Sequence, residues 1–456
     1  MTVGMFDSFF TRYWFSEAAK AIWSDHATLQ AWLDVEVALA RAQAELGLVP
    51  PEAAQTIEAK ARAELFDLDR LATDIAHVQH PFVPVLRQFE SLCGEPAAGF
   101  IHWGATTQNI FDTAAALQLR RSHALLVERV DAAAAAMAEL AVRHRDTPQA
   151  GRTHGQHALP MTFGFKVAGW LEEVRRHRAR LLAQESQVFV ASLGGAIGTF
   201  AAMGGQGRAV QARLADILGL TPATIPMRSS FDRIAGYVST LGLLAGTSEK
   251  IAQDVVFMQR GEIGEAEEAF YTGKVGSSTM AQKRNPATAL LLISLTRMAR
   301  SRVALALESM VRMDEGDSSA SNVADVLLPE AAILAVSIAE KLAQLMGGLV
   351  VYPEAMRRNL DLSGGRILSE AVMMRLAERI GRHHAHHVLY EAAQRSATEG
   401  IAFATAIAEH PAMRDAATGL DLASLLNPAT YLGEAGDCVD DVVTASDQDR
   451  PVSPKQ

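Results

Sequence analysis

The chain has 456 residues, of which 49% are apolar, 21% charged and only 6% aromatic. This composition is typical of a soluble globular protein whose helices are filled with alanine and leucine, and the length suffices for two or three structural regions. The formal net charge of −10 gives no electrostatic support for a nucleic-acid partner, so a small anionic substrate would need a local cationic pocket.

Several features bear on the cellular compartment. Two cysteines, Cys93 and Cys438, are too few for a disulfide framework or a thiolate metal site, which favours a reducing environment. The first residues, MTVGMFDSFF, do not have the cationic start and apolar core of a signal peptide. The most apolar stretch, residues 331–351, is interrupted by Glu340 and Lys341, so no membrane span is predicted. We therefore expect a cytoplasmic protein.

Helical periodicity dominates the chain. In residues 29–50, LQAWLDVEVALARAQAELGLVP, apolar side chains recur every three or four positions, and Gly47 and Pro50 predict the end of that helix. A helix of more than thirty residues is predicted to begin near Asp112, as its N-cap, and to stop before Pro148. Similar long patterns cover roughly residues 162–191, 233–260, 286–313 and 323–349.

These lengths exceed the average helix of about eleven residues and predict an all-α bundle. Strand signals are sparse, and β-like pieces such as QVFVASL are interpreted as helix continuations. We expect an N-terminal helical region over residues 1–100, a central long-helix bundle over 101–350, and a C-terminal helical region over 351–456. The last of these ends in a polar tail, DQDRPVSPKQ, that is expected to be disordered.

Four segments interrupt the helical pattern with polar residues: HVQHPFVP (77–84), HWGATTQNIFDT (102–113), GRTHGQHALP (151–160) and GSSTMAQKRNP (276–286). In the second, a flexible Gly104 precedes short polar groups at a helix start, where free N–H groups and the helix dipole favour an anion. The alternative is an ordinary capping loop with Asp112 as the cap.

Histidines are grouped in two places. His154, flanked by threonine and glutamine, could exchange protons near neutral pH, although a hydrogen-bonded loop histidine is the alternative. His383, His384, His386 and His387 would spread over more than one face of a helix, and no acidic residue or cysteine completes a ligand set. We predict a solvated face there and no metal site.

The segment 276–286 has the composition of a loop that closes over a substrate. A serine hydroxyl is a poor base unless its alkoxide is stabilised, which loop amides and a nearby cation could do in a dry site. Lys283 could hold a carboxylate, Asn285 adds an amide donor, and Pro286 starts the next helix.

These segments resemble the aspartase/fumarase superfamily. Residues 276–286 match its motif GSS-x-M-P-x-K-x-N-P except that Ala281 replaces the proline, and GATTQNIFDT and GRTHGQHALP match the other two family segments in order. The similarity spans nearly the whole chain and is strongest to the branch of adenylosuccinate lyase and bacterial 3-carboxy-cis,cis-muconate cycloisomerase.

The resemblance implies a three-region helical protomer whose central helices form a twenty-helix core in a homotetramer. Each active site would take loops from three subunits, with no metal and no cofactor. The implied chemistry is anti β-elimination from a substituted succinate, a small dicarboxylate, with release of fumarate. Ser277 would be the base and His154 the general acid. The implied substrate-binding residues are Lys283, Asn285, Thr106, Thr107, Thr153, Gln156 and His80.

Departures from the family patterns bear on the substrate. Adenylosuccinate lyases carry E-R-D-L-S-H-S-S-V-E-R where this chain reads RMDEGDSSASN (312–322), so Met313 and Asn322 stand where arginines serve the nucleotide. The cycloisomerases usually have a tryptophan-containing segment in place of Thr153-His154. We therefore expect elimination, with C–N cleavage, from a smaller succinate whose cationic leaving group would suit the acidic Glu315 and Asp317. Lactonising cycloisomerisation and an inactive, crystallin-like scaffold are the alternatives.

Overall fold

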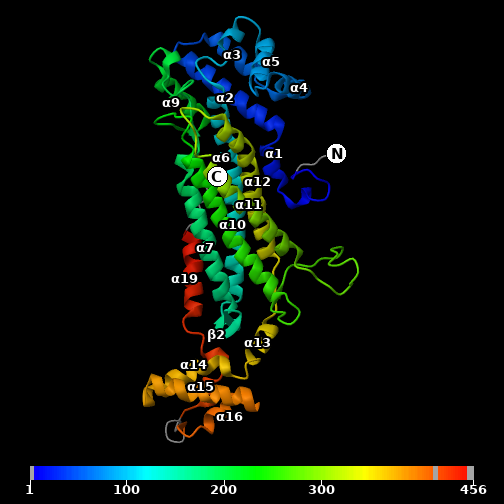
Figure 1. Ribbon diagram of the computed structural model, residues 1–456, viewed down its shortest axis with the longest axis vertical. Helices are drawn as coiled ribbons and strands as arrows, with labels where there is room; N and C mark the ends of the chain where they lie inside the picture. The colour runs from blue at the N-terminus through cyan, green and yellow to red at the C-terminus, as the bar shows by residue number, and fades with distance from the viewer. Residues whose placement is uncertain (1–4, 414–419, 449–456) are drawn as a thin grey trace. The chain divides into compact units, whose positions relative to one another are not determined.

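The computed structural model describes residues 5–413 and 420–448, and the predicted all-α fold is confirmed (Figure 1). The chain divides into two compact units. The first takes the chain up to Asp131 together with Arg176–Glu249 and Leu291–Lys341, and the second takes Ala132–Arg175, Lys250–Leu290 and the chain from Leu342 onward. The division near residues 100 and 350 remains a prediction, and the polar tail beyond residue 448 lies outside the described residues.

The longest helices reproduce the long periodic patterns. They are α6 (Thr107–Arg143), α7 (Phe163–Ala183), α10 (Asp232–Met258), α11 (Ala287–Glu308) and α12 (Ser318–Gly347). One predicted boundary is wrong, because α6 begins at Thr107 and Asp112 lies in its second turn rather than at its N-cap. The Asn109 side chain instead accepts the Thr106 backbone N–H (3.1 Å), which satisfies a donor at the helix start.

The first unit adds shorter elements to its parts of the long helices. They are η1 (Arg12–Trp14), α1 (Glu17–Ile22), α2 (Asp25–Glu45), α3 (Pro51–Lys60), η2 (Ala63–Leu65), α4 (Leu68–Val78), α5 (Val83–Cys93), η3 (Ala97–Phe100), α8 (Glu185–Val188), η4 (Ala201–Met203), α9 (Gly207–Leu218) and the parallel strands β3 (Val190–Ala191) and β4 (Thr221–Pro222). QVFVASL is therefore not a helix continuation throughout, because α8 ends at Val188 and β3 follows.

Helix α2 shows how sequence signals set an element in this unit. Ser24 caps it by accepting the Ala27 N–H, and the chain leaves it through Gly47 in the left-handed region, as predicted. Its buried face carries Leu29 and Leu33 among other apolar residues, and packs against α3 and α9. The same face also buries the polar side chains of Glu36 and Gln43, which a purely structural helix does not need.

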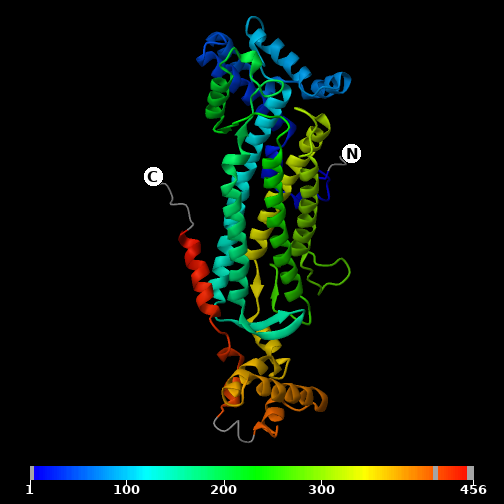
Figure 2. The same ribbon diagram turned by 60° about the vertical axis from the view of Figure 1, so that its left-hand side comes forward.

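The second unit contains a β-hairpin that the sequence did not predict, drawn as a pair of arrows in Figure 2. Strands β1 (Pro148–Thr153) and β2 (Gln156–Thr162) pair in antiparallel register. Their turn is His154-Gly155, and both residues have positive φ (53° and 75°), which matches the right-handed twist of a hairpin. Gly151 lies at a bulge, where an added Cβ would come 2.8 Å from the Leu159 carbonyl oxygen.

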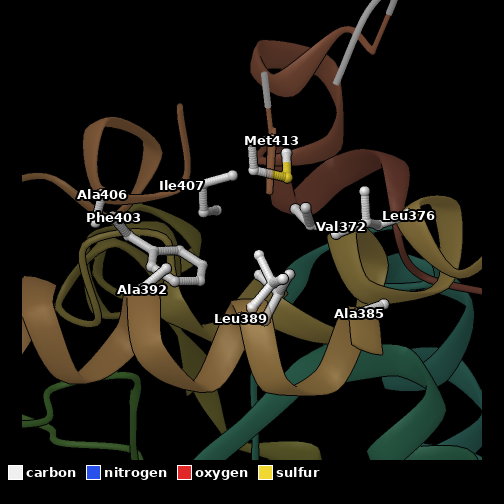
Figure 3. Packing of buried hydrophobic residues seen from close by; sticks show 10 residues of the cluster. Val372, Leu376, Ala385, Leu389, Ala392, Phe403, Ala406, Ile407 and Met413 are labelled. Atoms are coloured by element: carbon white, nitrogen blue, oxygen red, sulfur yellow. The ribbon is translucent and has the colours of Figure 1, made fainter. Parts of the chain in front are cut away.

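The remaining elements belong to the second unit. They are the antiparallel strands β5 (Ala266–Glu267) and β6 (Val350–Val351), α13 (Pro353–Asp361), η5 (Arg366–Leu368), α14 (Ser369–Ile380), α15 (Arg382–Glu399), α16 (Phe403–Ala408), α18 (Leu422–Leu425), η6 (Pro428–Thr430) and α19 (Ala435–Gln448). Helices α14, α15 and α16 enclose an apolar cluster that includes Val372, Leu389 and Phe403 (Figure 3). Spacings of three and four residues place these side chains on inward faces.

Helix α12 is long and apolar enough to cross a membrane by length and composition alone. However, 67% of its most apolar window is buried inside the fold. A helix covered in this way is what the core of a soluble protein presents, because a spanning helix would expose that surface to lipid. The prediction that residues 331–351 are not a membrane span agrees with this burial.

We predict that Phe403→Ala destabilises the helical cluster of α14, α15 and α16. The ring is 1% exposed, so its removal should lower the free energy of unfolding of this part by about 3–5 kcal/mol through lost burial and a cavity. Urea denaturation with hydrogen exchange at α14–α16 amides measures the change. Tyr390→Ala on α15, where the ring is 57% exposed, is the matched control and should change little. Equal losses in both variants would contradict the packing described.

Candidate active site

In the first unit, the loop that precedes α6 is held by the two buried polar residues of α2. The Glu36 carboxylate accepts from the His102 backbone N–H (3.1 Å) and lies 2.6 Å from His102 Nδ1. Gln43 Nε2 donates to the Trp103 carbonyl oxygen (2.7 Å). These contacts fix the loop backbone and direct Thr106 and Thr107 to the beginning of α6, where unpaired N–H groups favour an anion.

A glycine-rich segment, residues 194–198, lies beside that helix start and was not singled out from the sequence. Asn109 Oδ1 accepts from both the Thr106 and Gly195 backbone N–H groups (3.1 Å each). Gly198 has a positive φ, and an added Cβ there would meet the Pro226 carbonyl oxygen at 2.7 Å. The signal that could have found this segment is its run of glycines, SLGGAIG, between two helices.

His80 lies in the same unit, in the turn before α5. Its Nδ1 accepts from the Phe82 and Val83 backbone N–H groups (3.2 and 3.1 Å), which leaves Nε2 as the ring's donor. The Phe82 ring packs edge-on against Phe111 of α6, with ring centroids 5.6 Å apart, and lies 5.4 Å from the His102 ring. This contact joins the segments that carry His80, Thr106 and Thr107.

Asp112, one turn further along α6, is a partly buried acid among charged neighbours. Its Oδ1 accepts from Gln108 Nε2 at 2.6 Å. Burial raises the pKa of Asp112 to about 6, although the Gln108 hydrogen bond and the Arg312 guanidinium both act to lower it. A carboxyl group with such a pKa changes charge within the physiological range.

In the second unit, the hairpin is anchored by a buried ion pair. Arg152 binds the Glu265 carboxylate with both guanidinium ends (2.9 and 2.5 Å), and Asn359 Nδ2 donates to the same carboxylate at 2.8 Å. The Glu265 side chain is 0% exposed, so its charge depends on these protein groups rather than on water. The hairpin end, with Thr153, His154 and Gln156, remains exposed.

The segment 276–286 forms a loop that is closed on itself. Asn285 Nδ2 donates to the Gly276 carbonyl oxygen (2.5 Å), and an added Cβ on Gly276 would lie only 2.0 Å from the Lys283 carbonyl oxygen. Ser277 Oγ accepts from the Thr279 and Met280 backbone N–H groups (3.3 and 3.1 Å). Two such donors stabilise negative charge on the serine oxygen.

Glu268, to which the sequence analysis gave no role, fixes the base of this loop. Its carboxylate accepts from the Thr288 and Ala289 backbone N–H groups (2.9 and 3.0 Å) and so caps α11. The same carboxylate accepts from Lys274 Nζ at 2.6 Å. The buried Glu268 carboxylate therefore binds groups on both sides of the segment 276–286, which carries Ser277.

The predicted site residues fall in two groups. His80 and the pair Thr106-Thr107 lie in the first unit, on segments that the contact of Phe82 with Phe111 joins. Two further sets belong to the second unit: the hairpin residues Thr153, His154 and Gln156, and the loop residues Ser277, Lys283 and Asn285. The hairpin attaches to Glu265 through Arg152, and the loop attaches to Gln259, whose Nε2 donates to the Arg284 carbonyl oxygen. Among the described residues, no hydrogen bond joins Ser277 to His154, and Lys283 makes no ion pair. Their roles remain a prediction.

The histidines of α15 do not form a metal centre. His383, His384, His386 and His387 are exposed, as predicted for a solvated face, and His387 pairs with Glu391 at 3.1 Å. Over residues 5–413 and 420–448, no group of three or more histidine, cysteine, aspartate or glutamate side chains could hold a metal ion. Cys93 and Cys438 are free thiols.

Comparisons with known proteins match the chain over nearly its full length. The family model described as Lyase matches residues 15–303, and Adenylosuccinate lyase C-terminus matches residues 365–442. The chain is 38% identical to N-acetyl-S-(2-succino)cysteine lyase of Dickeya dadantii, covering 94% of both chains. It is also 38% identical to 3-carboxy-cis,cis-muconate cycloisomerase of Pseudomonas aeruginosa, covering 93% and 94% of the two chains. Among solved structures, 3-carboxy-cis,cis-muconate lactonizing enzyme from Pseudomonas putida has a TM-score of 0.90 at 36% identity, with 96% and 99% of the chains covered.

We predict that Gly276→Ala prevents the closed form of the loop. The new Cβ would collide with the Lys283 backbone, which cannot move without breaking the Asn285 hydrogen bond. Limited trypsin digestion should then cleave faster at Lys283 and Arg284. Gly261→Ala, where an added Cβ meets no atom within 4 Å, is the control and should digest like the parent. Unchanged cleavage in Gly276→Ala would show that the loop is not closed.

We also predict that Arg152→Met is strongly destabilising. It leaves the Glu265 charge buried without its cation, which costs about 3–5 kcal/mol. Urea denaturation measures the loss. Arg375→Met removes an exposed pair with Glu378 (58% and 61% exposed) in the same unit and should stay within about 0.5 kcal/mol of the parent. A small effect of Arg152→Met would refute the anchoring role of the ion pair.

Proposed function

Because this chain belongs to the aspartase/fumarase superfamily of lyases, we propose that it catalyses β-elimination from a 2-substituted succinate and releases fumarate. The observation that carries the proposal is the environment of Ser277, whose Oγ receives two backbone N–H donors. The same loop presents Lys283, which forms no ion pair within residues 5–413 and 420–448. Donors aimed at a developing alkoxide are what a serine needs to act as a base.

The proposed reaction assigns one role to each group. Ser277 removes the proton beside one carboxylate, and the resulting negative charge spreads into that carboxylate next to Lys283. The carbon–heteroatom bond then breaks, and His154 gives its proton to the leaving atom. Asn285, whose amide closes the loop, keeps one N–H for a substrate carboxylate. Thr106, Thr107, Thr153 and Gln156 bind the succinyl part, and Nε2 of His80 supports the acid.

We propose that the leaving atom is sulfur rather than the nitrogen expected from the sequence. The argument for an amine was the charge of Glu315 and Asp317. However, the Asp317 carboxylate caps the start of α12 by accepting from the Ser319 N–H (2.9 Å), and it also accepts from the Met313 N–H (3.2 Å), so it serves the backbone. A thiolate leaves more readily than an amine because its conjugate acid is stronger. The similarity to N-acetyl-S-(2-succino)cysteine lyase supports this choice.

Lactonising cycloisomerisation is the second candidate. Its support is the similarity to the two Pseudomonas cycloisomerases in sequence and in fold. It shares a carboxylate-stabilised intermediate with β-elimination but requires an unsaturated tricarboxylate. An inactive scaffold is disfavoured by the set of Ser277, His154, Lys283 and Asn285, which a purely structural protein does not need.

We further propose a cytoplasmic homotetramer with a twenty-helix core and active sites shared by three subunits, without a metal or cofactor. Large apolar side chains exposed on the long helices support such an assembly. Leu243 of α10, Leu307 of α11 and Val326 of α12 are each more than half exposed. Exposed apolar side chains of this kind mark surfaces that another chain covers.

A direct test runs the elimination in reverse. The protein is incubated with fumarate and a panel of thiols, amines and ammonia, and adducts are identified by mass. A succinyl thioether is expected. An amine adduct would restore the carbon–nitrogen assignment. A parallel incubation contains 3-carboxy-cis,cis-muconate instead of fumarate, and its consumption, with no adduct in the fumarate mixtures, would favour the second candidate.

We predict that Ser277→Ala lowers kcat by about 10²–10⁴-fold, the range for loss of a general base. Fumarate release from the succinyl thioether measures this, and KM should change little because Lys283 remains. Ser278→Ala, the neighbouring serine, is the matched control and should retain most activity. Full turnover by Ser277→Ala would reject the assignment of the base.

A further inference from the structure

A cavity of about 50 Å³ lies beside α6 in the first unit, and none of the residues that line it has a role in the reaction proposed above. Its walls combine apolar side chains, such as Leu119 and Phe231, with the charged groups of Asp112, Arg233 and Arg312. Since one enclosed water molecule takes about 10–15 Å³ of such space, the cavity has room for about four waters or for a polar group of about four non-hydrogen atoms. It can hold one small functional group but not a whole substrate.

Two arginines at this cavity keep unused hydrogen-bond donors. Arg312 is held in place, because its Nε donates to the Ser309 carbonyl oxygen (2.9 Å) and its Nη1 donates to the Arg228 carbonyl oxygen (3.0 Å). Its guanidinium group also stacks on the Phe231 ring, 4.4 Å from the ring centroid. In the described part of the chain, Nη2 of Arg312 and all side-chain nitrogens of Arg233 make no hydrogen bond, and neither arginine forms an ion pair. The cavity therefore presents cationic donors on a fixed frame.

A buried serine adds a third free donor. Ser192 follows β3 and lines the cavity, and it is only 8% exposed. Its backbone N–H donates to Thr113 Oγ1 (3.1 Å), but its hydroxyl group makes no hydrogen bond within residues 5–413 and 420–448. Because an unpaired buried hydroxyl is unfavourable, this group needs an acceptor from outside the chain. Ser230, which also lines the cavity, is exposed, so the wall that it forms reaches the surface.

The cavity lies close to the start of α6. Asp112, in the cavity wall, follows Thr107 by five residues, which corresponds to about 7.5 Å along the helix axis. Arg228, whose carbonyl oxygen holds Arg312, also donates through Nη1 to the Ala196 carbonyl oxygen (2.8 Å), in the glycine-rich segment beside that helix start. The separation matches the reach of a short substituent on a ligand that is bound at the helix start.

The charges at this cavity suit one carboxylate. Arg233 and Arg312 give its walls two positive charges, and Asp112 gives one negative charge when it is ionised. The carboxylates of Asp317 and Asp325 are close enough to affect Arg312 but do not line the cavity. One carboxylate from a ligand would neutralise the remaining positive charge, and its two oxygens match the planar donors of a guanidinium group. A phosphate group carries up to about two negative charges, so repulsion by Asp112 disfavours it.

We propose that this cavity is the subsite for a carboxylate group on the leaving thiol. The proposal rests on the function proposed above, in which the start of α6 binds the succinyl part and sulfur is the leaving atom. The substrates are then succinyl thioethers of mercapto acids, whose carboxylate accepts from Arg312 Nη2, from Arg233 and from the Ser192 hydroxyl. The chain thus binds an anionic leaving group although Met313 and Asn322 replace the arginines that serve a nucleotide.

The test compares mercapto acids with their uncharged amides in the reverse reaction. The full-length protein is incubated with fumarate and with mercaptoacetate, 3-mercaptopropionate or the amide of either acid, and the loss of fumarate gives kcat/KM for each thiol. The acid-to-amide ratio of kcat/KM is compared between proteins, so that differences in thiol reactivity cancel. We expect the ratio to fall by about 10–100-fold in Arg233→Gln, the effect of losing hydrogen bonds to a charged group.

Matched variants separate the subsite from other causes. Arg233→Gln is the first choice because Arg233 makes no side-chain hydrogen bond whose loss would disturb the fold. Ser192→Ala removes a single hydroxyl group and should lower the ratio several-fold, which keeps the test open if the arginine variant fails to fold. Arg208→Gln, an exposed arginine on α9 in the same unit, should keep the ratio of the parent. A parental ratio in both Arg233→Gln and Ser192→Ala would overturn the proposal.

A binding measurement distinguishes failure of the subsite from failure of the proposed function. Saturation-transfer NMR should detect propionate but not propionamide on the parent protein, and the propionate signal should be lost in Arg233→Gln. If no thiol adds to fumarate but this pattern appears, the elimination fails and the carboxylate site stands. If thiols add with one ratio in all variants, the elimination stands and the subsite fails. Propionate binding without any preference for acids in turnover would indicate a site for free anions and would also overturn the proposal.

Discussion

The buried carboxylate of Glu265 is the group on which the second unit depends. The carboxylate accepts hydrogen bonds from Arg152 of the hairpin and from Asn359 of α13. The backbone carbonyl oxygen of Glu265 accepts from the Tyr352 backbone N–H (2.9 Å), beside the β5–β6 pair. Because an uncompensated charge in the protein interior is costly, these partners cannot separate independently. The hairpin that presents His154 and the chain that leads to Ser277 are consequently fixed with respect to the same atom group.

Buried polar groups have an equivalent role in the first unit. Glu36, Gln43 and Asn109 hold the loop before α6 and the glycine segment beside it, while the aromatic contact of Phe82 with Phe111 adds the turn that carries His80. Apolar packing alone would tolerate small shifts of these segments, because it has no preferred direction. Hydrogen bonds between buried groups do impose direction, which suits the segments that we propose bind the substrate.

Much of this arrangement could be predicted from the sequence. The 3.6-residue periodicity predicted the long helices, and the motif at 276–286 predicted a loop that carries Ser277. The hairpin was missed because Gln156–Thr162 lacks strict alternation and its turn, His154-Gly155, has no common turn signature. The start of α6 was misplaced because Asn109, not Asp112, satisfies the free donor. No role was predicted for Glu265 or Glu268. The partners of Glu265, Arg152 and Asn359, lie far away in the sequence, and the partners of Glu268 lie on both sides of the loop 276–286.

The contact between Asn285 and Gly276 has a thermodynamic consequence for the segment it encloses. Closing a flexible loop of nine residues costs about 2 kcal/mol of chain entropy. The hydrogen bond from Asn285 to Gly276 already provides that ordering, so a ligand that binds at this loop would not have to restrict the whole segment. In the elimination proposed above, more of the substrate's interaction energy would then remain to distinguish the transition state from the ground state. The loop combines the accessibility of a surface segment with the preorganisation of a core element.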